Sequence, residues 1–254
     1  MRGCLRVVGL GPGAATQVTP QAADALADAT DLVGYQTYLD RVAPSAHQRR
    51  HASDNREELD RARHALTLAA DGARVAVVSS GDPGVFAMAA AVFEAVEMGP
   101  QHWRAIDIQI IPGITAMMAA AARIGAPLGH DFCAISLSDN LKPWTLVLRR
   151  LEAAATAGFV IALYNPASKA RPWQLDAAFD ALRLRLPDTT PVMFATAVGR
   201  ADEHIDVVDL SVAEGNRADM RTLVIIGSRH IRRIARPHGA DWLYSPRGVP
   251  EDCA

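Results

Sequence analysis

This 254-residue sequence has few cysteines, almost no excess of one charge over the other, and no long apolar run. The three cysteines, Cys4, Cys133 and Cys253, lie far apart and include no CxxC pair, which argues against a disulfide framework or a zinc site and favours a reducing cytoplasm. The formal net charge of -2 gives no reason to expect nucleic acid as a partner. No apolar run reaches the roughly 20 residues of a membrane-spanning helix, and no secretion signal is evident. These absences predict a cytoplasmic protein that needs no metal, membrane or nucleic acid.

Half of the residues are apolar, enough to bury one large core or two smaller ones. Up to about residue 112, strand-like apolar runs alternate with helix-like segments, which predicts a mostly parallel sheet covered by helices. After residue 190, three predicted strands follow one another without a full helix between them, which predicts antiparallel pairing. We therefore expect two α/β domains, residues 1–113 with a mostly parallel sheet and residues 114–236 with a mixed, largely antiparallel sheet, followed by a tail at residues 237–254.

The individual elements follow from apolar periodicity and from turn and capping residues. Strands are predicted at residues 5–9, 31–35, 75–78, 106–111, 132–136, 159–164, 191–197, 205–210 and 222–226. Helices are predicted at residues 20–29, 54–71, 85–98, 114–122, 143–157 and 172–186. The polar run 47–51 is interpreted as a solvated connector, and the arginine-rich run 229–236 as a surface helix end, with an anion contact as the alternative.

The strand at residues 75–78 runs into SSGDPG, the stretch from which the site prediction starts. Gly81 and Gly84 permit a positive φ or a close backbone approach, Pro83 fixes φ, and Asp82 is placed to cap the next helix. Such a loop lies at the carboxyl end of a parallel strand, where open α/β sheets bind small molecules. By itself the loop is equally consistent with a tight turn that binds nothing.

Two more glycine-proline loops end predicted strands, GLGPG at residues 9–13 and PGITA at residues 112–116. The first also matches the loose dinucleotide fingerprint GxGxxA, which presents a helix N-terminus to a pyrophosphate directly after the glycines. Here Pro12 removes a donor and the predicted helix begins only at Pro20, so that geometry is poorly served. Three loops of backbone groups suit a polar ligand without phosphate instead, such as an adenosine with an amino-acid tail and a sulfonium centre.

Five motifs together resemble the tetrapyrrole methylase family, the S-adenosylmethionine-dependent enzymes that methylate precorrins on the way to cobalamin. The motifs are GLGPG (9–13), SSGDPGVF (79–86), PGITA (112–116), HDFCAISLSD (130–139) and YNPASKAR (164–171). Three stretches are most similar to members that methylate precorrin-3B at ring carbon 17 and contract the macrocycle to precorrin-4: GYQTYLD (34–40), HDFCAISLSDNLKPW (130–144) and YNPASKAR (164–171). Another precorrin or cobalt-precorrin-3 as substrate, and a tetrapyrrole-binding protein without catalysis, are the alternatives.

The resemblance implies the tetrapyrrole methylase fold, usually a homodimer, with S-adenosylmethionine in the cleft between two α/β domains and S-adenosylhomocysteine as product. It also implies cofactor contacts at the three loops and at two later strand ends. These contacts are Pro12, Ser80, Gly81, Asp82, Val85, Thr115, Ala116, Asn165 and Ala197.

Methyl transfer from an activated sulfonium needs no acid help, whereas ring contraction requires proton transfers. An acid–base group is therefore expected beside the substrate. Ser138 and Asp139 in the SLSD turn are the predicted catalytic residues. A helix cap before Pro143 is an equally good interpretation of Asp139. The predicted substrate contacts are Tyr35, Lys142, Arg171 and Arg200, the two arginines as partners for acid side chains.

Overall fold

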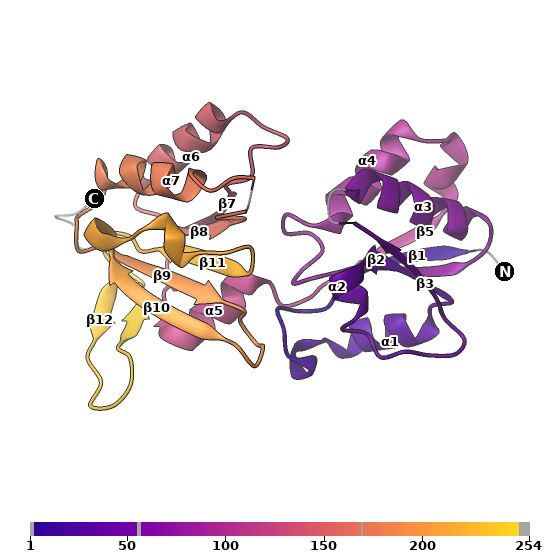
Figure 1. Cartoon of the computed structure of the whole chain (residues 1–254), viewed down its shortest axis with the longest axis horizontal. Coiled ribbons are helices and arrows are strands. Elements are labelled where there is room, and N and C mark those ends of the chain that lie inside the picture. The colour runs from indigo at the N-terminus through magenta and orange to yellow at the C-terminus, as the bar shows by residue number, and fades with distance from the viewer. Residues whose placement is uncertain (1–2, 55–56, 169, 249–254) are drawn as a thin grey trace. The chain divides into compact units, whose positions relative to one another are not determined.

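A computed structural model of the chain describes residues 3–54, 57–168 and 170–248. The chain divides into two compact units, Met1–Ala116 and Met117–Ala254, each built around its own five-stranded sheet (Figure 1). The division falls at the start of a helix, close to the expected boundary after residue 113. Of the expected tail, residues 249–254, with Cys253, lie outside the described residues.

The sheet of the first unit has the strand order β3-β2-β4-β1-β5, and all of its neighbouring pairs are parallel, as predicted. Its strands are β1 (Cys4–Gly9), β2 (Asp31–Tyr35), β3 (Arg49–Ser53), β4 (Arg74–Ser79) and β5 (Asp107–Ile111). Its helices are α1 (Pro20–Asp28), α2 (Gln36–Leu39), α3 (Glu58–Ala70) and α4 (Met88–Met98), with the 3-10 helices η1 (Ala15–Gln17) and η2 (Gln101–Ala105).

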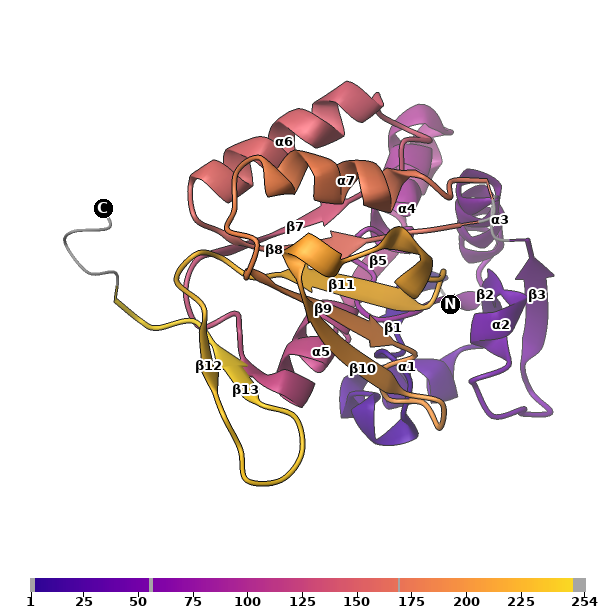
Figure 2. The same cartoon turned by 60° about the vertical axis from the view of Figure 1, so that its left-hand side comes forward.

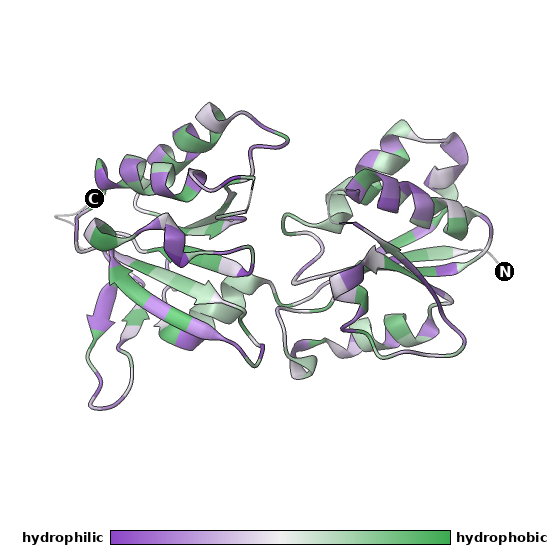
Figure 3. Cartoon of the chain, viewed as in Figure 1, coloured by the Kyte–Doolittle hydropathy of each residue, from purple (hydrophilic) through white to green (hydrophobic). Residues whose placement is uncertain are grey.

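The continuous apolar runs of β1 and β4 follow from burial on both faces of this sheet. Val7 and Val77 pack in the cluster that includes α3 and α4, whereas Val8 and Val78 pack with the residues of α1. Figure 1 shows α3 and α4 on one face and α1 on the other, and Figure 3 shows that the central strands are mostly apolar. Because both faces are covered, the carboxyl edge of the sheet remains as the place for polar chemistry.

The prediction of a solvated connector at residues 47–51 is wrong, because strand β3 begins there. β3 pairs in parallel with β2 at the edge of the sheet, and its side chains, apart from that of Ala52, are polar and mostly exposed. Ion pairs, and not apolar burial, stabilise this strand. Arg49 and His51 both lie 2.9 Å from the fully buried carboxylate of Asp31. A strand anchored by charge has no apolar alternation from which it could be predicted.

The helix predicted from residue 85 starts later, as α4 at Met88. Phe86 has a φ of 51°, a left-handed conformation that a right-handed helix cannot include. Asp82 therefore does not cap α4, contrary to the prediction. Its carboxylate instead accepts hydrogen bonds from the backbone of its own loop and of the loop after β5.

The main sheet of the second unit has the order β10-β9-β11-β8-β7; only the β7–β8 pair is parallel, which confirms a mixed sheet. Its strands are β7 (Phe132–Ser136), β8 (Val160–Tyr164), β9 (Pro191–Thr196), β10 (His204–Asp209) and β11 (Thr222–Ile226). The helices are α5 (Ala116–Ile124), α6 (Trp144–Thr156) and α7 (Gln174–Arg183), with the 3-10 helices η3 (Leu210–Val212) and η4 (Gly215–Arg217).

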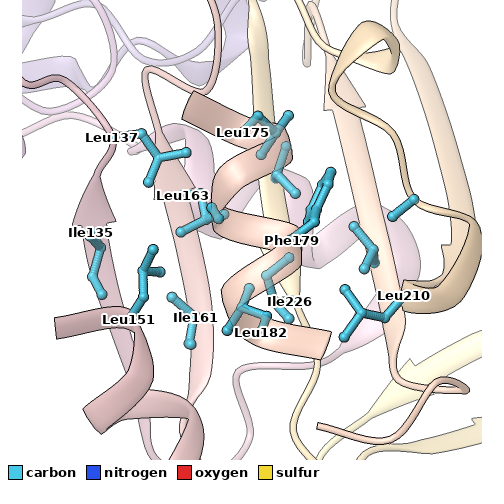
Figure 4. Packing of buried hydrophobic residues seen from close by; sticks show 14 of the residues in the cluster. Ile135, Leu137, Leu151, Ile161, Leu163, Leu175, Phe179, Leu182, Leu210 and Ile226 are labelled. Carbon is cyan, nitrogen blue, oxygen red and sulfur yellow. The ribbon is translucent and has the colours of Figure 1, made fainter. Parts of the chain in front are cut away.

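Helices α6 and α7 cover one face of this sheet, and α5 lies on the other (Figures 1 and 2). Figure 4 shows Leu175, Phe179 and Leu182 of α7 pointing into the core that α7 forms with the strands. The ring of Phe179 meets that of Phe194 edge to face, with 6.1 Å between centroids. This core fixes the strands whose ends carry the predicted residues of the second unit.

The arginine-rich run predicted as a helix end is wrong in type, because it contains strand β12 (Arg232–Ile234). β12 pairs with β13 (Trp242–Tyr244), which lies in the expected tail and also pairs with the short strand β6 (Gly125–Ala126), forming a three-stranded sheet (Figure 2). All three residues of β12 are exposed, so no apolar periodicity marks it. Among the described residues, no helix has both the length and the apolar character needed to cross a bilayer.

Candidate functional site

Two of the three predicted loops are joined directly by their backbones. The amide of Gly11 donates to the carbonyl of Gly81 at 3.1 Å, and the amide of Gly81 donates to the carbonyl of Gly11 at 3.0 Å. Both residues have a positive φ, 67° and 62°, which glycine adopts at low cost. The loops after β1 and β4 are therefore joined to each other at the carboxyl edge of the first sheet.

Asp82 joins the third loop to the second. Its Oδ2 accepts from the amide of Gly113 at 3.0 Å, and its Oδ1 accepts from the amide of Gly84 at 2.8 Å. The approach is close, because a β-carbon built on Gly113 would lie 2.2 Å from the carbonyl oxygen of Gly81. The structure thus brings together the three loops that the sequence singled out.

The backbone around Gly81 offers both donors and acceptors. A β-carbon built on Gly81 would lie 3.8 Å from the amide nitrogen of Ala116 and the Cα of Thr115, and 3.9 Å from the carbonyl oxygen of Ile114. The amide of Val85 is turned back onto the carbonyl of Asp82 at 3.2 Å. An amide and a carbonyl flanking a glycine fit the adenosine and amino-acid groups of a nucleoside cofactor.

The first loop is unsuited to a pyrophosphate, which weakens the dinucleotide alternative. The amides of Leu10 and Gly11 donate to the carbonyls of Ser79 and Gly81, and Pro12 has no amide hydrogen. The amide of Ala14 donates to the side chain of Gln17 at 3.2 Å. A phosphate cradle needs such amides to point at the ligand.

Three strands of the second unit end at one edge of its sheet. β7 and β8 are parallel, and β9 runs in the same direction because β11 is antiparallel to both β8 and β9. The Oγ of Ser136 accepts from the Nδ2 of Asn165 at 3.0 Å and from the amide of Ser138 at 3.3 Å. The SLSD turn is therefore hydrogen-bonded to the segment after β8.

Asp139 does not cap helix α6, contrary to one of its two interpretations. Its Oδ2 accepts from the Nε2 of Gln174 at 3.2 Å, and α6 begins after Pro143. Gln174, at the start of α7, is 2% exposed, so this contact fixes the carboxylate from the buried side. The geometry leaves the acid–base role of Asp139 as a prediction.

The predicted substrate contacts follow strands in both units, Tyr35 in the first unit and the three cations in the second. Tyr35 ends β2, with its ring edge-on to Tyr38 at 5.4 Å between centroids. Lys142 precedes α6, and burial, with the charge of Arg150, lowers the pKa of its ammonium. Arg200 lies in the turn after β9, where its amide donates to the carbonyl of Ala197 at 3.0 Å.

Arg171 carries a further sign of a binding role. Its Nη1 is buried, and it makes no hydrogen bond in the part of the chain that the structure describes. A buried cationic donor without an acceptor is costly. A ligand carboxylate would supply the missing acceptor.

The described non-glycine residues with a positive φ include two predicted cofactor contacts. Asn165 and Ala197 both have a φ of 52°, and Phe86 in the second loop has 51°. Strained backbone of this kind is concentrated at functional sites, and the cofactor roles that the family resemblance implies for these two residues stay predictions. The Asn165–Pro166 dipeptide is a turn signal, whereas nothing in the sequence marks Ala197 as strained.

Arg41 is a residue of this region that the sequence did not reveal. Its guanidinium contacts both the first and the second loop. An arginine after a short helix carries no pattern that would separate it from surface arginines, and only the fold shows where it reaches.

Comparisons with known proteins identify the family of the chain. The family model for tetrapyrrole (corrin/porphyrin) methylases matches residues 5–214. The precorrin-3B C(17)-methyltransferase of a Sinorhizobium species is 61% identical over 247 residues, which cover 97% of each chain. A probable cobalt-factor III C(17)-methyltransferase of Salmonella typhimurium is 39% identical over 89% of this chain and 92% of that protein.

The solved crystal structure of the methyltransferase CobJ superimposes with a TM-score of 0.92 at 52% sequence identity, over 96% of this chain and 100% of the other. That likeness extends over both sheets, the parallel one and the mixed one. The fold, the family model and the full-length relative agree: the chain belongs to the tetrapyrrole (corrin/porphyrin) methylase family.

Proposed function

We propose that this protein transfers a methyl group from S-adenosylmethionine to ring carbon 17 of precorrin-3B during cobalamin biosynthesis. The observation that carries the proposal is the 61% identity, over 97% of both chains, to a precorrin-3B C(17)-methyltransferase. We further propose that the reaction contracts the macrocycle and gives precorrin-4.

The methyl donor is assigned to the joined loops of the first unit. Ser80, Gly81 and Asp82 would hold it from one side, with Pro12 and Val85 nearby. The backbone of Thr115 and Ala116, which lines the space beside Gly81, would hold it from the other. When bound, the donor supplies an activated methyl group; the chain has to orient the acceptor carbon and exclude water. The contacts predicted for Asn165 and Ala197 remain predictions.

The substrate is a tetrapyrrole with several acid side chains, and the second unit offers cations for them. Arg171 has the buried, unpaired Nη1 described above, and Lys142 is half-buried before α6. Arg200 and Tyr35 are the other proposed contacts. Paired guanidinium–carboxylate bonds are strong and directional, so they would fix the orientation of the ring.

For ring contraction we propose Ser138 and Asp139 as the acid–base pair. The Asp139 carboxylate is held by Gln174, and the amide of Ser138 by Ser136. A carboxylate fixed through one oxygen keeps lone pairs on the other to accept a proton. That arrangement is what a general base requires.

The direct test is turnover. The purified protein is incubated with precorrin-3B and methyl-labelled S-adenosylmethionine, and the product is identified by mass and absorption spectrum. We expect a ring-contracted product that carries one labelled methyl group. Binding of precorrin-3B without label transfer would favour a tetrapyrrole carrier. Faster turnover of the cobalt-containing substrate would move the assignment to cobalt-factor III, as in the Salmonella relative.

We also propose that the protein works in the cytoplasm as a homodimer, as the family resemblance implies. Sedimentation equilibrium tests the dimer, because a monomer at micromolar concentration would exclude it. Cell fractionation tests the compartment.

A further inference from the structure

Arg41 connects the ends of three neighbouring strands. The short helix α2 directly follows β2, and Arg41 lies just after α2. The guanidinium of Arg41 extends past the end of β4 to the loop after β1. Its Nη1 donates to the Oγ of Ser80 at 3.3 Å. Its Nη2 lies 2.9 Å from the carbonyl oxygen of Leu10, 3.0 Å from that of Gly11 and 3.4 Å from that of Gly13. One side chain thus touches both loops that meet at the Gly11–Gly81 pair.

The backbone that carries Arg41 is itself anchored. Its amide donates to the carbonyl of Tyr38 at 3.1 Å, which closes a turn after α2. Arg50 of β3 donates to the carbonyls of Leu39 and Val42 at 2.9 and 2.6 Å, which flank Arg41 in the chain. The guanidinium therefore reaches the loops from a fixed base.

The chemistry explains why an arginine is placed here. Three carbonyls of the first loop face Arg41. Pro12 in the same loop has no amide hydrogen that could be donated to them. A guanidinium stays charged and presents several donors in one plane, so it satisfies clustered carbonyls that a lysine, as a point charge, would satisfy less well. Because Nη1 occupies a lone pair of Ser80 Oγ, the hydroxyl hydrogen of Ser80 is directed away from Arg41.

We propose that Arg41 is a positioning residue for the methyl donor: it fixes the first and second loops relative to each other and orients the Ser80 hydroxyl. This inference rests on the proposed function, because the ligand of these loops is taken to be S-adenosylmethionine. Arg41 acts through Ser80 and the loop backbone. Its role is to present the loops in their binding conformation before the ligand arrives.

The test measures the affinity of S-adenosylhomocysteine by calorimetry for wild type, Arg41→Lys and Arg41→Ala. Loss of charge-assisted hydrogen bonds that hold a binding loop should weaken affinity roughly tenfold to hundredfold in Arg41→Ala, with Arg41→Lys between it and wild type. In turnover, the KM for S-adenosylmethionine should rise, while kcat at saturating donor and the KM for precorrin-3B stay near wild type. A merely structural role would lower the melting temperature and the active fraction without that split.

Arg74→Gln is the matched control. Arg74 also donates to a backbone carbonyl, that of Asp28 at 2.8 Å, but it lies at the amino end of β4, at the opposite edge of the same sheet. We expect its affinity for S-adenosylhomocysteine to equal that of wild type. Wild-type affinity in folded Arg41→Ala would overturn the proposal.

A double-mutant cycle with Ser80→Ala adds a second criterion. If Arg41 acts through Ser80, the two substitutions together should weaken binding by less than the product of their separate effects. Simple multiplication of the two effects would contradict the claim that Arg41 orients the hydroxyl.

Failure of the proposed function would be recognised separately. If wild type does not bind S-adenosylhomocysteine, the assignment of the ligand is wrong. Hydrogen exchange of the ligand-free protein then still decides whether Arg41 orders the loops. The Gly11 and Gly81 amides should exchange faster in Arg41→Ala than in wild type, and equal rates would overturn the positioning role as well.

Discussion

Gly11 and Gly81 exchange two backbone hydrogen bonds, of 3.1 and 3.0 Å, at the carboxyl edge of the parallel sheet. This pair joins the loops after β1 and β4, and Asp82 extends the connection to Gly113 in the loop after β5. The glycines are needed for two different reasons. Gly11 and Gly81 supply a positive φ, whereas Gly113 supplies room for a neighbouring carbonyl.

Replacing Gly113 by alanine should therefore separate the loops. Its β-carbon would lie 2.2 Å from the carbonyl oxygen of Gly81, a clash with backbone that cannot turn away as a flexible side chain can. We expect a loss of about 1–3 kcal/mol in the free energy of unfolding and a clear loss of affinity for S-adenosylhomocysteine. Thermal unfolding and calorimetry measure the two effects.

Gly248→Ala is the control, because a β-carbon there meets nothing within 4 Å. It should match wild type in both measurements. A Gly113→Ala variant with wild-type affinity would show that the contact between the second and third loops does not shape the site.

The strain at Ala197 gives a prediction of opposite sign. Its φ of 52° costs an alanine about 1–2 kcal/mol that a glycine would not bear. Ala197→Gly should therefore leave the free energy of unfolding unchanged or raise it, by about 1 kcal/mol at most. Chemical denaturation of the variant measures this.

Ala162→Gly, in the middle of β8, provides the comparison. That residue is buried and in an ordinary strand conformation, so glycine should lower stability there by at least about 0.5–1 kcal/mol. Equal destabilisation at both positions would mean that Ala197 bears no strain.

If Ser138 and Asp139 are the acid–base pair, their loss should slow ring contraction more than methyl transfer. Asp139→Asn keeps the shape of the side chain but removes its basicity, and Ser138→Ala removes a hydroxyl from the same turn. Contraction should slow by roughly 10²–10⁴-fold while methyl transfer continues, so an uncontracted methylated product should accumulate. Mass and absorption spectra of the products, compared at equal cofactor occupancy, identify it. Normal rates of contraction in both variants would place the acid–base group elsewhere.

Acid should weaken the turn after Ala197. The hydrogen bond from Arg123 lowers the pKa of the Glu203 carboxyl, burial opposes that shift, and the amide of Gly199 adds to the lowering. Because the pKa is lower in the folded state, this stabilisation is complete above the ordinary carboxyl pKa and is lost as the pH falls through the folded value. Wild type should therefore be more stable than Glu203→Gln at pH 7, and the difference should shrink below about pH 4.3.

Unfolding free energies measured from pH 3 to 7 for both proteins test this dependence. Glu152→Gln, which removes a partly exposed carboxylate 3.8 Å from Arg185, should show little difference from wild type at any pH. A Glu203 difference that does not change with pH would mean that the carboxylate charge contributes nothing.

The sequence predicted the parts of the fold that depend on apolar burial. β2, β7 and β11 occupy the predicted residues because their runs are apolar and bounded by turn residues. β3 and β12 escaped prediction because ion pairs and backbone pairing hold them, and neither leaves an apolar pattern.

The candidate site divides in the same way. Glycine and proline revealed the three loops, since those residues report unusual backbone geometry. Arg41 and Gln174 act over long sequence separations, and the sequence contains no signal of where they reach. Asn165 and Ala197 came from the family resemblance, and their positive φ became visible only in the structure.

If the joined loops of the first unit hold the methyl donor, Asp82→Ala should bind S-adenosylhomocysteine more weakly than the wild type does. The Asp82 carboxylate accepts hydrogen bonds from the amides of Gly84 and Gly113. Loss of the carboxylate should therefore loosen the second and third loops and weaken binding by about tenfold or more. Asp60→Ala, which removes an exposed carboxylate from α3, should bind as wild type does. Calorimetry that finds wild-type affinity in folded Asp82→Ala, or binding of NAD in place of S-adenosylhomocysteine by the wild type, would show that these loops do not hold the methyl donor.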